Sequence, residues 1–438
     1  MIMQGGIPDR AKAPEIREFG ELVMPDVTKS VLDNGIPLYR LDHGNQEACC
    51  LTCVWRGGVA ESSAKSLPAL VLSMMREGTA SHDGEEIADI IEYNGAKLFV
   101  SADSHFSTLK LYTLNSMAAN VIPLLPEMML EPTFPEKNFE VLREKVAKNE
   151  EIKRAKVEAQ AAIAINRMVM GEGHPLAVDE TPEEIRRYTR DDLLRWHKKV
   201  FTPVVDDAGE SSMTLFLAGR ITPEIERLVR DLFGSMPVKR GTPLPFNIVK
   251  FDCRAVAEER IRVDGALQSA VRMAVPAIGR EHPDYIALRL LVMALGGYFG
   301  SRLMSNIRED KGYTYGINSY LLGYPEGGII GISSSTDNST VDPLIEETIR
   351  EIKRLSTGDF KDEEMKRLKQ HAMSSLASSL DSPFDIMDYY INRLVAFIPP
   401  KYFERQVAAV KSLTAEELAR VAREHFSLDR LNIAVAGA

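Results

Sequence analysis

A chain of 438 residues is too long for one hydrophobic core and predicts about two to four domains. Hydrophobic residues make up 45% of the chain and charged residues 26%, which excludes a disordered protein, and no apolar run is long enough to predict a membrane-inserted helix. The net charge of −10 disfavours nucleic acids and anionic lipid surfaces as partners.

The elements predicted from the first half of the chain begin with strands and continue with helices. A hairpin is predicted around Asp33-Asn34-Gly35, because this turn sequence stands between two apolar runs. Asp83 is a predicted N-cap, and Gly95 follows the end of the same helix. Further strands are predicted at 48–56, 97–103, 106–114 and 213–218, and helices at 67–76, 85–93, 117–130, 135–170, 183–188 and 191–200.

The second half of the chain repeats the first. Segment 134–145 returns as 360–371, and 189–201 returns as 414–426, each about 225 residues further on. The stretch 235–250 between the copies is rich in proline, as a semi-rigid linker is. We therefore predict two homologous α+β domains of about 200 residues, 1–234 and 251–438. Each is expected to pack an antiparallel or mixed β-sheet against helices, and the two are expected to face each other across a cleft.

The stretch 296–320 contains the strongest candidate for a functional pair. Apolar residues recur in it at helical spacing, and Gly312 then allows the chain to reverse into a strand at low cost. Arg308 on the helix and Tyr315 on the strand are therefore predicted to converge. Such a pair can orient a carbonyl group and donate hydrogen bonds to a developing oxyanion. One pair with this spacing is also expected by chance among the basic residues of the chain.

Several short motifs follow one another in a recognisable order. They are Gly78-Thr79 after an apolar helix, Gly95-Ala96 before a strand, His174-Pro175-Leu176, Phe201-Thr202-Pro203 after the helix 191–200, and the helix and strand of 296–320. This ordered set resembles the pitrilysin/insulinase superfamily of inverzincin metallopeptidases, in its smaller two-domain processing-peptidase form. In that family the helix before Gly-Thr carries His-x-x-Glu-His, in which two histidines bind zinc and the glutamate activates water.

The zinc motif is degenerate in this chain. Ala69 and Ser73 stand where the resemblance places the two histidines, and Leu72 stands where it places the glutamate. The third family ligand falls on Glu150, and one carboxylate cannot replace a set of three protein ligands. No metal or other cofactor is therefore expected in this chain. The histidines at 174, 197 and 425 are expected to have structural roles.

Arg308 and Tyr315 match the family's second site, which the resemblance assigns to substrate binding and to the tetrahedral intermediate. Tyr313 and Arg302 are candidate accessories. In bacterial members of this type, one chain keeps the zinc motif and its partner keeps the arginine and tyrosine. The resemblance thus implies a catalytically incomplete subunit of a heterodimeric zinc peptidase, with peptide substrates and with zinc in a homologous partner subunit. Self-association is the alternative to that partner.

Two other functions are compatible with the same fold. The first is a non-catalytic scaffold or peptide-binding protein, an alternative that the loss of the zinc motif leaves open. The second is an independent zinc peptidase, which Ala69, Leu72 and Ser73 exclude.

The four cysteines do not form a disulfide framework, because three of them cluster at 49–53 and Cys253 stands alone. A reducing compartment, the cytoplasm, is therefore expected. The periplasm is the alternative if a signal peptide has been removed.

Overall fold

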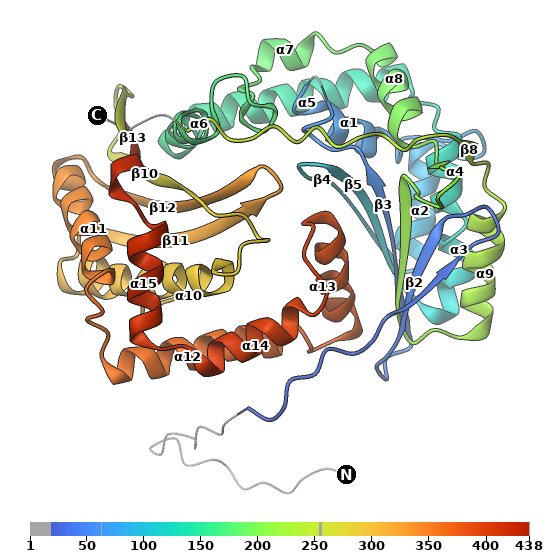
Figure 1. The fold of residues 1–438 in the computed structure, drawn as a ribbon. Helices are drawn as coiled ribbons and strands as arrows, with labels where there is room; N and C mark the ends of the chain where they lie inside the picture. Colours follow the sequence, from blue (N-terminus) through green and yellow to red (C-terminus); the bar gives the residue numbers. More distant parts are fainter. Residues whose placement is uncertain (1–18, 63, 254–255, 438) are drawn as a thin grey trace, which may run out of the picture.

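The computed structural model describes residues 19–62, 64–253 and 256–437, which form two α+β halves side by side (Figure 1). The strands of the first sheet are, in order, β1 (Thr28–Val31), β2 (Pro37–Asp42), β7 (Met213–Gly219), β3 (Ala48–Arg56), β5 (Phe106–Leu114) and β4 (Lys97–Ala102). Those of the second are β11 (Thr314–Tyr324), β12 (Gly327–Asp337), β10 (Gln268–Ala277), β13 (Asn432–Gly437) and β9 (Ala257–Arg262). β6 (Val204–Val205) and β8 (Lys239–Arg240) form a separate parallel pair.

Both large sheets have the same topology. The order β2-β7-β3-β5-β4 of the first sheet corresponds to β9-β13-β10-β12-β11 of the second. One pair in each sheet is parallel, β2 with β7 and β9 with β13, and the other neighbouring strands are antiparallel. The repeat seen in the sequence is therefore present in the backbone. The expected fold class, two similar halves that each pack a mixed sheet against helices, is confirmed.

The helices surround the two sheets. Those before residue 240 are α1 (Leu67–Met74), α2 (Gly84–Tyr93), α3 (Ala118–Val121), α4 (Leu124–Leu130), α5 (Glu136–Arg154), α6 (Val157–Met170), α7 (Pro182–Arg186), α8 (Arg190–Val200) and α9 (Pro223–Gly234). Those after it are α10 (Tyr285–Gly296), α11 (Val341–Leu355), α12 (Asp362–Ser378), α13 (Pro383–Val395), α14 (Tyr402–Ser412) and α15 (Ala415–His425). Single helical turns are η1 (Asn115–Met117), η2 (Pro175–Ala177), η4 (Asn338–Thr340) and η5 (Leu428–Arg430), and η3 (Met304–Asp310) is a π-helix. Within the described ranges, no helix has the length and apolar character that crossing a bilayer requires.

The repeated helices α8 and α15 begin with the same kind of cap. The Thr189 hydroxyl accepts a hydrogen bond from the backbone N–H of Asp192 at 3.3 Å, and the Thr414 hydroxyl accepts one from Glu417 at 3.1 Å. Each bond satisfies an N–H group that has no partner inside its helix, an arrangement worth about 1 kcal/mol. The sequence similarity of these two segments is thus matched by a shared local structure.

The helix predicted over 135–170 is broken in the structure. α5 ends at Arg154 and α6 begins at Val157, because Lys156 between them has the extended conformation φ −88°, ψ 136°. Neither glycine nor proline stands at the break, so the sequence lacks the usual signal for it. The break separates a helix that stays on the first half from one that crosses to the second.

Each half lends one helix to the other half's sheet. α6 packs on β10 and β13 of the second sheet, and α13 packs on β7 and β2 of the first (Figure 1). The α6 contact includes small buried side chains that allow close approach, Ala161 and Ala164 with Ala270, Ala274, Ala434 and Ala436, and larger ones such as Ile165 and Met168. The α13 contact uses larger apolar residues, among them Ile386, Met387 and Ile391. The two halves therefore share their hydrophobic cores.

A buried ionic cluster also joins the halves. Nδ1 of His105 lies 2.6 Å from Oε1 of Glu61, and its Nε2 lies 2.7 Å from Oε1 of Glu326 in the β11–β12 turn. The exposed fractions of the three side chains are 1%, 3% and 0% for His105, Glu61 and Glu326. The rings of Phe246 and Phe397 pack against His105. We call His105, Glu61 and Glu326 the interdomain triad.

The interdomain triad is expected to make stability fall in mildly alkaline solution. Burial alone would lower the pKa of His105, but the hydrogen bonds to Glu326 and Glu61 outweigh it and raise the pKa to about 9. The stabilisation that follows from a raised pKa is complete below the unfolded value of about 6.5 and is lost as pH rises through about 9. The free energy of unfolding of the wild type, measured with urea, should decrease by on the order of 3 kcal/mol between about pH 6.5 and about pH 9. A His105→Gln variant should lack this pH-dependent decrease. Equal pH profiles of stability for the two proteins would contradict its attribution to His105.

Candidate functional site

Tyr315 lies on an irregular part of β11, the outermost strand of the second sheet. The pairing of β11 with β12 shifts by one residue between Thr314, which faces Thr336, and Ile317, which faces Ser334. The shift is a β-bulge that contains Tyr315 and Gly316. A bulge redirects side chains locally, and the Tyr315 side chain is 91% exposed. The phenol is therefore presented to solvent at the start of the strand.

Hydroxyl groups fix the shape of this bulge. Oγ1 of Thr314 accepts a hydrogen bond from the N–H of Gly316 at 3.1 Å and donates one to the carbonyl of Ser335 at 2.6 Å. Oγ of Ser334 lies 3.0 Å from both Oγ1 of Thr314 and the carbonyl of Gly316. Both hydroxyl-bearing side chains are buried. The backbone that carries the exposed Tyr315 is thus held by a buried network, as a preorganised site requires.

Arg308 lies on the π-helix η3, one tight turn before β11. Gly312 in that turn has φ +66°, a conformation that glycine adopts at low cost. The Arg308 guanidinium lies over the ring of Phe299, 5.0 Å from its centre, and it makes no ion pair with any described carboxylate. Its charge is therefore available to a ligand. No hydrogen bond joins it to Tyr315 among the described residues, so the convergence of the two side chains remains a prediction.

The π-helix is held in place by the helices behind it. Asn306 donates a hydrogen bond to Glu351 on α11 at 2.7 Å, and Lys311 forms an ion pair with Glu347 on the same helix. Arg302, a candidate accessory, is instead only 8% exposed and donates through Nε to Glu364 on α12 at 2.6 Å. Arg302 therefore anchors the segment that precedes Arg308. π-Helical turns are rare and frequently occur at functional sites.

The degenerate zinc positions offer no ligand set. Leu72 on α1 is completely buried among apolar side chains, and Ala69 on the same helix is exposed. The Ser73 hydroxyl donates to the carbonyl of Ala69 at 2.9 Å. Glu150 on α5 forms ion pairs with Lys153 and Arg154. Leu72 cannot activate water, and Ala69 and Ser73 offer no nitrogen ligand for zinc.

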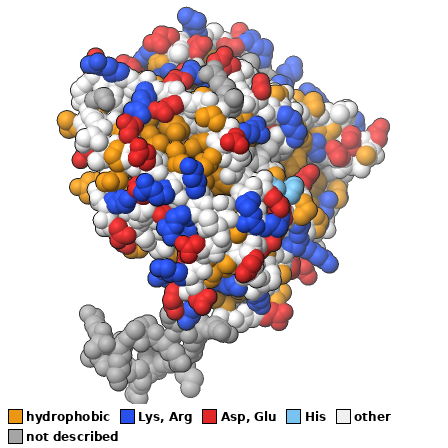
Figure 2. All heavy atoms as spheres, turned by 60° about the vertical axis from the view of Figure 1, so that its left-hand side comes forward, with side chains coloured by type: hydrophobic (Ala, Val, Ile, Leu, Met, Phe, Trp, Pro, Cys, Tyr) orange, Lys and Arg blue, Asp and Glu red, His pale blue; other side chains and the backbone are white. Residues whose placement is uncertain are grey.

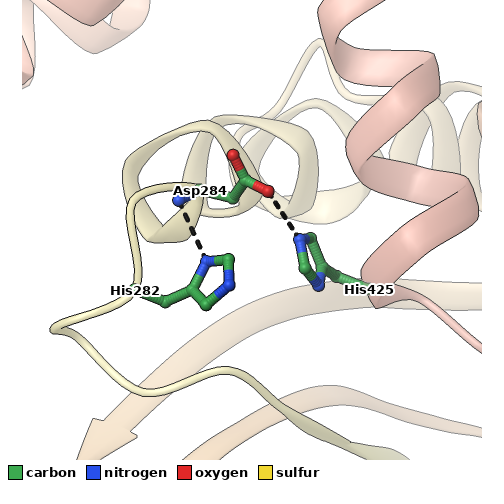
Figure 3. Close-up of side chains that lie close together, drawn as sticks. All are labelled: His282, Asp284 and His425. Atoms are coloured by element: carbon green, nitrogen blue, oxygen red, sulfur yellow. Dashed lines mark hydrogen bonds and ion pairs between the residues drawn. The ribbon is translucent and has the colours of Figure 1, made fainter.

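Figure 3 shows a cluster elsewhere in the second half, where His282, Asp284 and His425 bring potential metal ligands within 4.8 Å of one another. Nδ1 of His282 accepts the backbone N–H of Asp284 at 3.1 Å, which leaves the proton of the neutral ring on Nε2. Nε2 of His425 lies 2.7 Å from the Asp284 carboxylate, and Arg420 contacts both oxygens of that carboxylate. Arg420 and His425 hold the pKa of Asp284 well below its usual range. The cluster fits a hydrogen-bonded brace between α10 and α15 better than a metal centre.

The remaining histidines with predicted structural roles make backbone contacts. Nε2 of His174 lies 2.8 Å from the carbonyl of Val249, and Nε2 of His197 lies 2.9 Å from that of Met129. Sequence reasoning missed His105, because its partners are 44 and 221 residues away and no local pattern connects them.

Comparisons with known proteins agree with this picture. Residues 187–371 match the family model described as "Peptidase M16 inactive domain". YmxG of Bacillus subtilis, named an uncharacterized zinc protease, is 23% identical over 364 residues, which cover 81% of this chain and 84% of that protein. The "Non-peptidase homolog YmxG" of Helicobacter pylori is 20% identical over 392 residues, 86% of each chain. A solved peptidase M16 inactive domain from Pseudomonas fluorescens superposes with a TM-score of 0.83 at 21% identity and covers 94% of this chain and 98% of that one.

Proposed function

The chain belongs to the pitrilysin/insulinase-like (peptidase M16) superfamily, and on that premise we propose that it is the non-metal subunit of a heterodimeric zinc peptidase. The observation that carries the proposal is the contrast between its two sites. Tyr315 is exposed on a hydrogen-bonded bulge and Arg308 pairs with no described carboxylate, whereas Ala69, Leu72 and Ser73 provide no metal ligand.

The proposed division of chemistry assigns different steps to the two chains. A homologous partner with an intact zinc motif would supply the metal and the activated water. In this chain, the Arg308 guanidinium would hold the carbonyl of an extended peptide, and the Tyr315 hydroxyl would donate a hydrogen bond to the oxyanion as it forms. Both groups are hydrogen-bond donors whose effect is largest in the transition state, and neither acts as a nucleophile.

Reconstitution tests this proposal directly. The chain is purified alone and together with a zinc-motif homologue from the same cell, and zinc content and cleavage of quenched fluorescent peptides are measured. We expect less than about one tenth of a zinc per isolated chain, about one per heterodimer, and turnover only by the mixture. A His282→Ala variant controls for metal bound at the brace in Figure 3. Peptide cleavage by the isolated chain with one tightly bound zinc would refute the proposal.

The second candidate function is a scaffold that binds a partner or peptide without contributing to catalysis. The relative named a non-peptidase homolog favours it. The two functions differ in one measurable result. A scaffold should assemble with its partner and leave peptide turnover independent of Arg308 and Tyr315.

A further inference from the structure

A pocket of about 410 Å³ opens between α10, α12, α13 and α14 in the second half. Part of its lining is apolar and is supplied by Ile286, Leu290, Met293, Leu376 and Val410. Arg280 and Arg289 also line it, and no described aspartate or glutamate does. The pocket therefore combines an apolar surface with two positive charges in a chain whose net charge is −10.

Neither arginine of this pocket forms an ion pair with a carboxylate among the described residues. On the surface in Figure 2, acidic and basic side chains are interspersed. Some arginines of the second half, such as Arg420, pair with carboxylates, whereas Arg308 pairs with none that the structure describes. Arg280 donates through Nε to the carbonyl of Gly323 at 2.9 Å and pairs with no carboxylate that the structure describes. Arg289 makes no hydrogen bond or ion pair within the described part of the chain. Two arginines that pair with no described carboxylate thus line the same pocket, Arg280 half-buried and Arg289 exposed at its edge.

Two tyrosines, Tyr389 and Tyr402, also line the pocket. Tyr402 is only 2% exposed, and its hydroxyl has no hydrogen-bond partner among the described residues. Burial raises the pKa of Tyr402 and also that of Tyr389, so both phenols stay protonated at neutral pH. A buried hydroxyl without a partner costs free energy, and a bound anion that accepted its hydrogen bond would offset that cost.

We propose that this pocket binds a small amphipathic anion, a carboxylate or phosphate monoester that carries an apolar tail. The charged head pairs with Arg280 and Arg289, and the tail packs on the apolar side chains of α10 and α12. The volume is within the range of small-molecule sites. Because α13 leaves this pocket to pack on the first sheet, the ligand would lie where the two halves are joined. This site is separate from the proposed peptidase function.

Calorimetric titration of the full chain with octanoate, octyl phosphate and 1-octanol tests the proposal. We expect at least one of the two anions to bind one molecule per chain and at least tenfold more tightly than the alcohol of the same chain length. Arg289→Gln should weaken that binding at least tenfold, because it removes one of the two charges. Arg262→Gln, which replaces an exposed arginine on β9 outside the pocket, should leave it unchanged.

A second variant separates binding from folding. Tyr402→Phe removes a hydroxyl that lacks a partner, so the thermal midpoint of the free protein should stay the same or rise, while anion affinity falls. Equal affinity for octanol and both anions, or unchanged anion affinity in Arg289→Gln, would overturn the proposal.

Discussion

His105→Gln is expected to lower the free energy of unfolding at pH 7 by about 3 to 5 kcal/mol, and Glu326→Gln by much less. The reason is the charge balance of the interdomain triad, which holds one cation between two carboxylates in a site that water hardly reaches. Removing the cation leaves two buried carboxylates without a counter-charge. Removing one carboxylate leaves a matched pair, and glutamine can still accept the hydrogen bond from Nε2 of His105.

A double-mutant cycle makes this prediction specific. The variant His105→Gln/Glu326→Gln should be more stable than His105→Gln alone, because it removes one of the two unpaired carboxylates. Urea unfolding at pH 7 measures all four proteins. If His105→Gln lowers the free energy of unfolding by no more than Glu326→Gln does, the charges of the interdomain triad do not hold the two halves together.

Tyr315→Phe and Arg308→Ala are expected to lower peptide turnover by the reconstituted complex at least tenfold, and by about 10²- to 10³-fold if each donor contributes as oxyanion donors commonly do. Tyr315→Phe removes only a hydroxyl from an almost fully exposed side chain, so folding and assembly should not change. Its effect should appear in kcat. Arg308→Ala should also raise KM, because the guanidinium is proposed to hold the substrate carbonyl before the reaction.

A matched control is available two residues away. Tyr313 is partly buried against the core of the second half, and its carbonyl accepts a hydrogen bond from Thr336. Tyr313→Phe should therefore change turnover less than about twofold. Heterodimer assembly is followed by size-exclusion chromatography for each variant. Unchanged turnover in both Tyr315→Phe and Arg308→Ala would remove their catalytic assignment and favour the scaffold.

Local sequence patterns were sufficient to predict most of the fold. The predicted cap at Asp83, whose side chain accepts the N–H of Glu86, and the alternation of the strands act over a few residues, and the repeat made the second half comparable with the first. The break at Lys156 was not predictable, because packing on the second sheet favours it and no local residue requires it. The assignment of Ala69, Leu72 and Ser73 to degenerate zinc-motif positions follows from the family resemblance and stays a prediction.

The surroundings of the candidate pair were harder to predict. The sequence indicated Arg308 and Tyr315, but the β-bulge depends on hydroxyl groups of Thr314 and Ser334 that meet only when β11 pairs with β12. The interdomain triad depends on residues from opposite halves. Contacts between distant segments have no periodicity that a single sequence reveals.

The exchange of α6 and α13 bears on how such a chain could have arisen. If a single half-length ancestor carried the same helix, two copies would have covered each other's sheets as a symmetric dimer with swapped arms. Fusion of two such copies through one linker would then have kept the exchanged helix packing, and the sequences of the two copies could have diverged. The side chains within one half could then change while its helix remained necessary to cover the sheet of the other half.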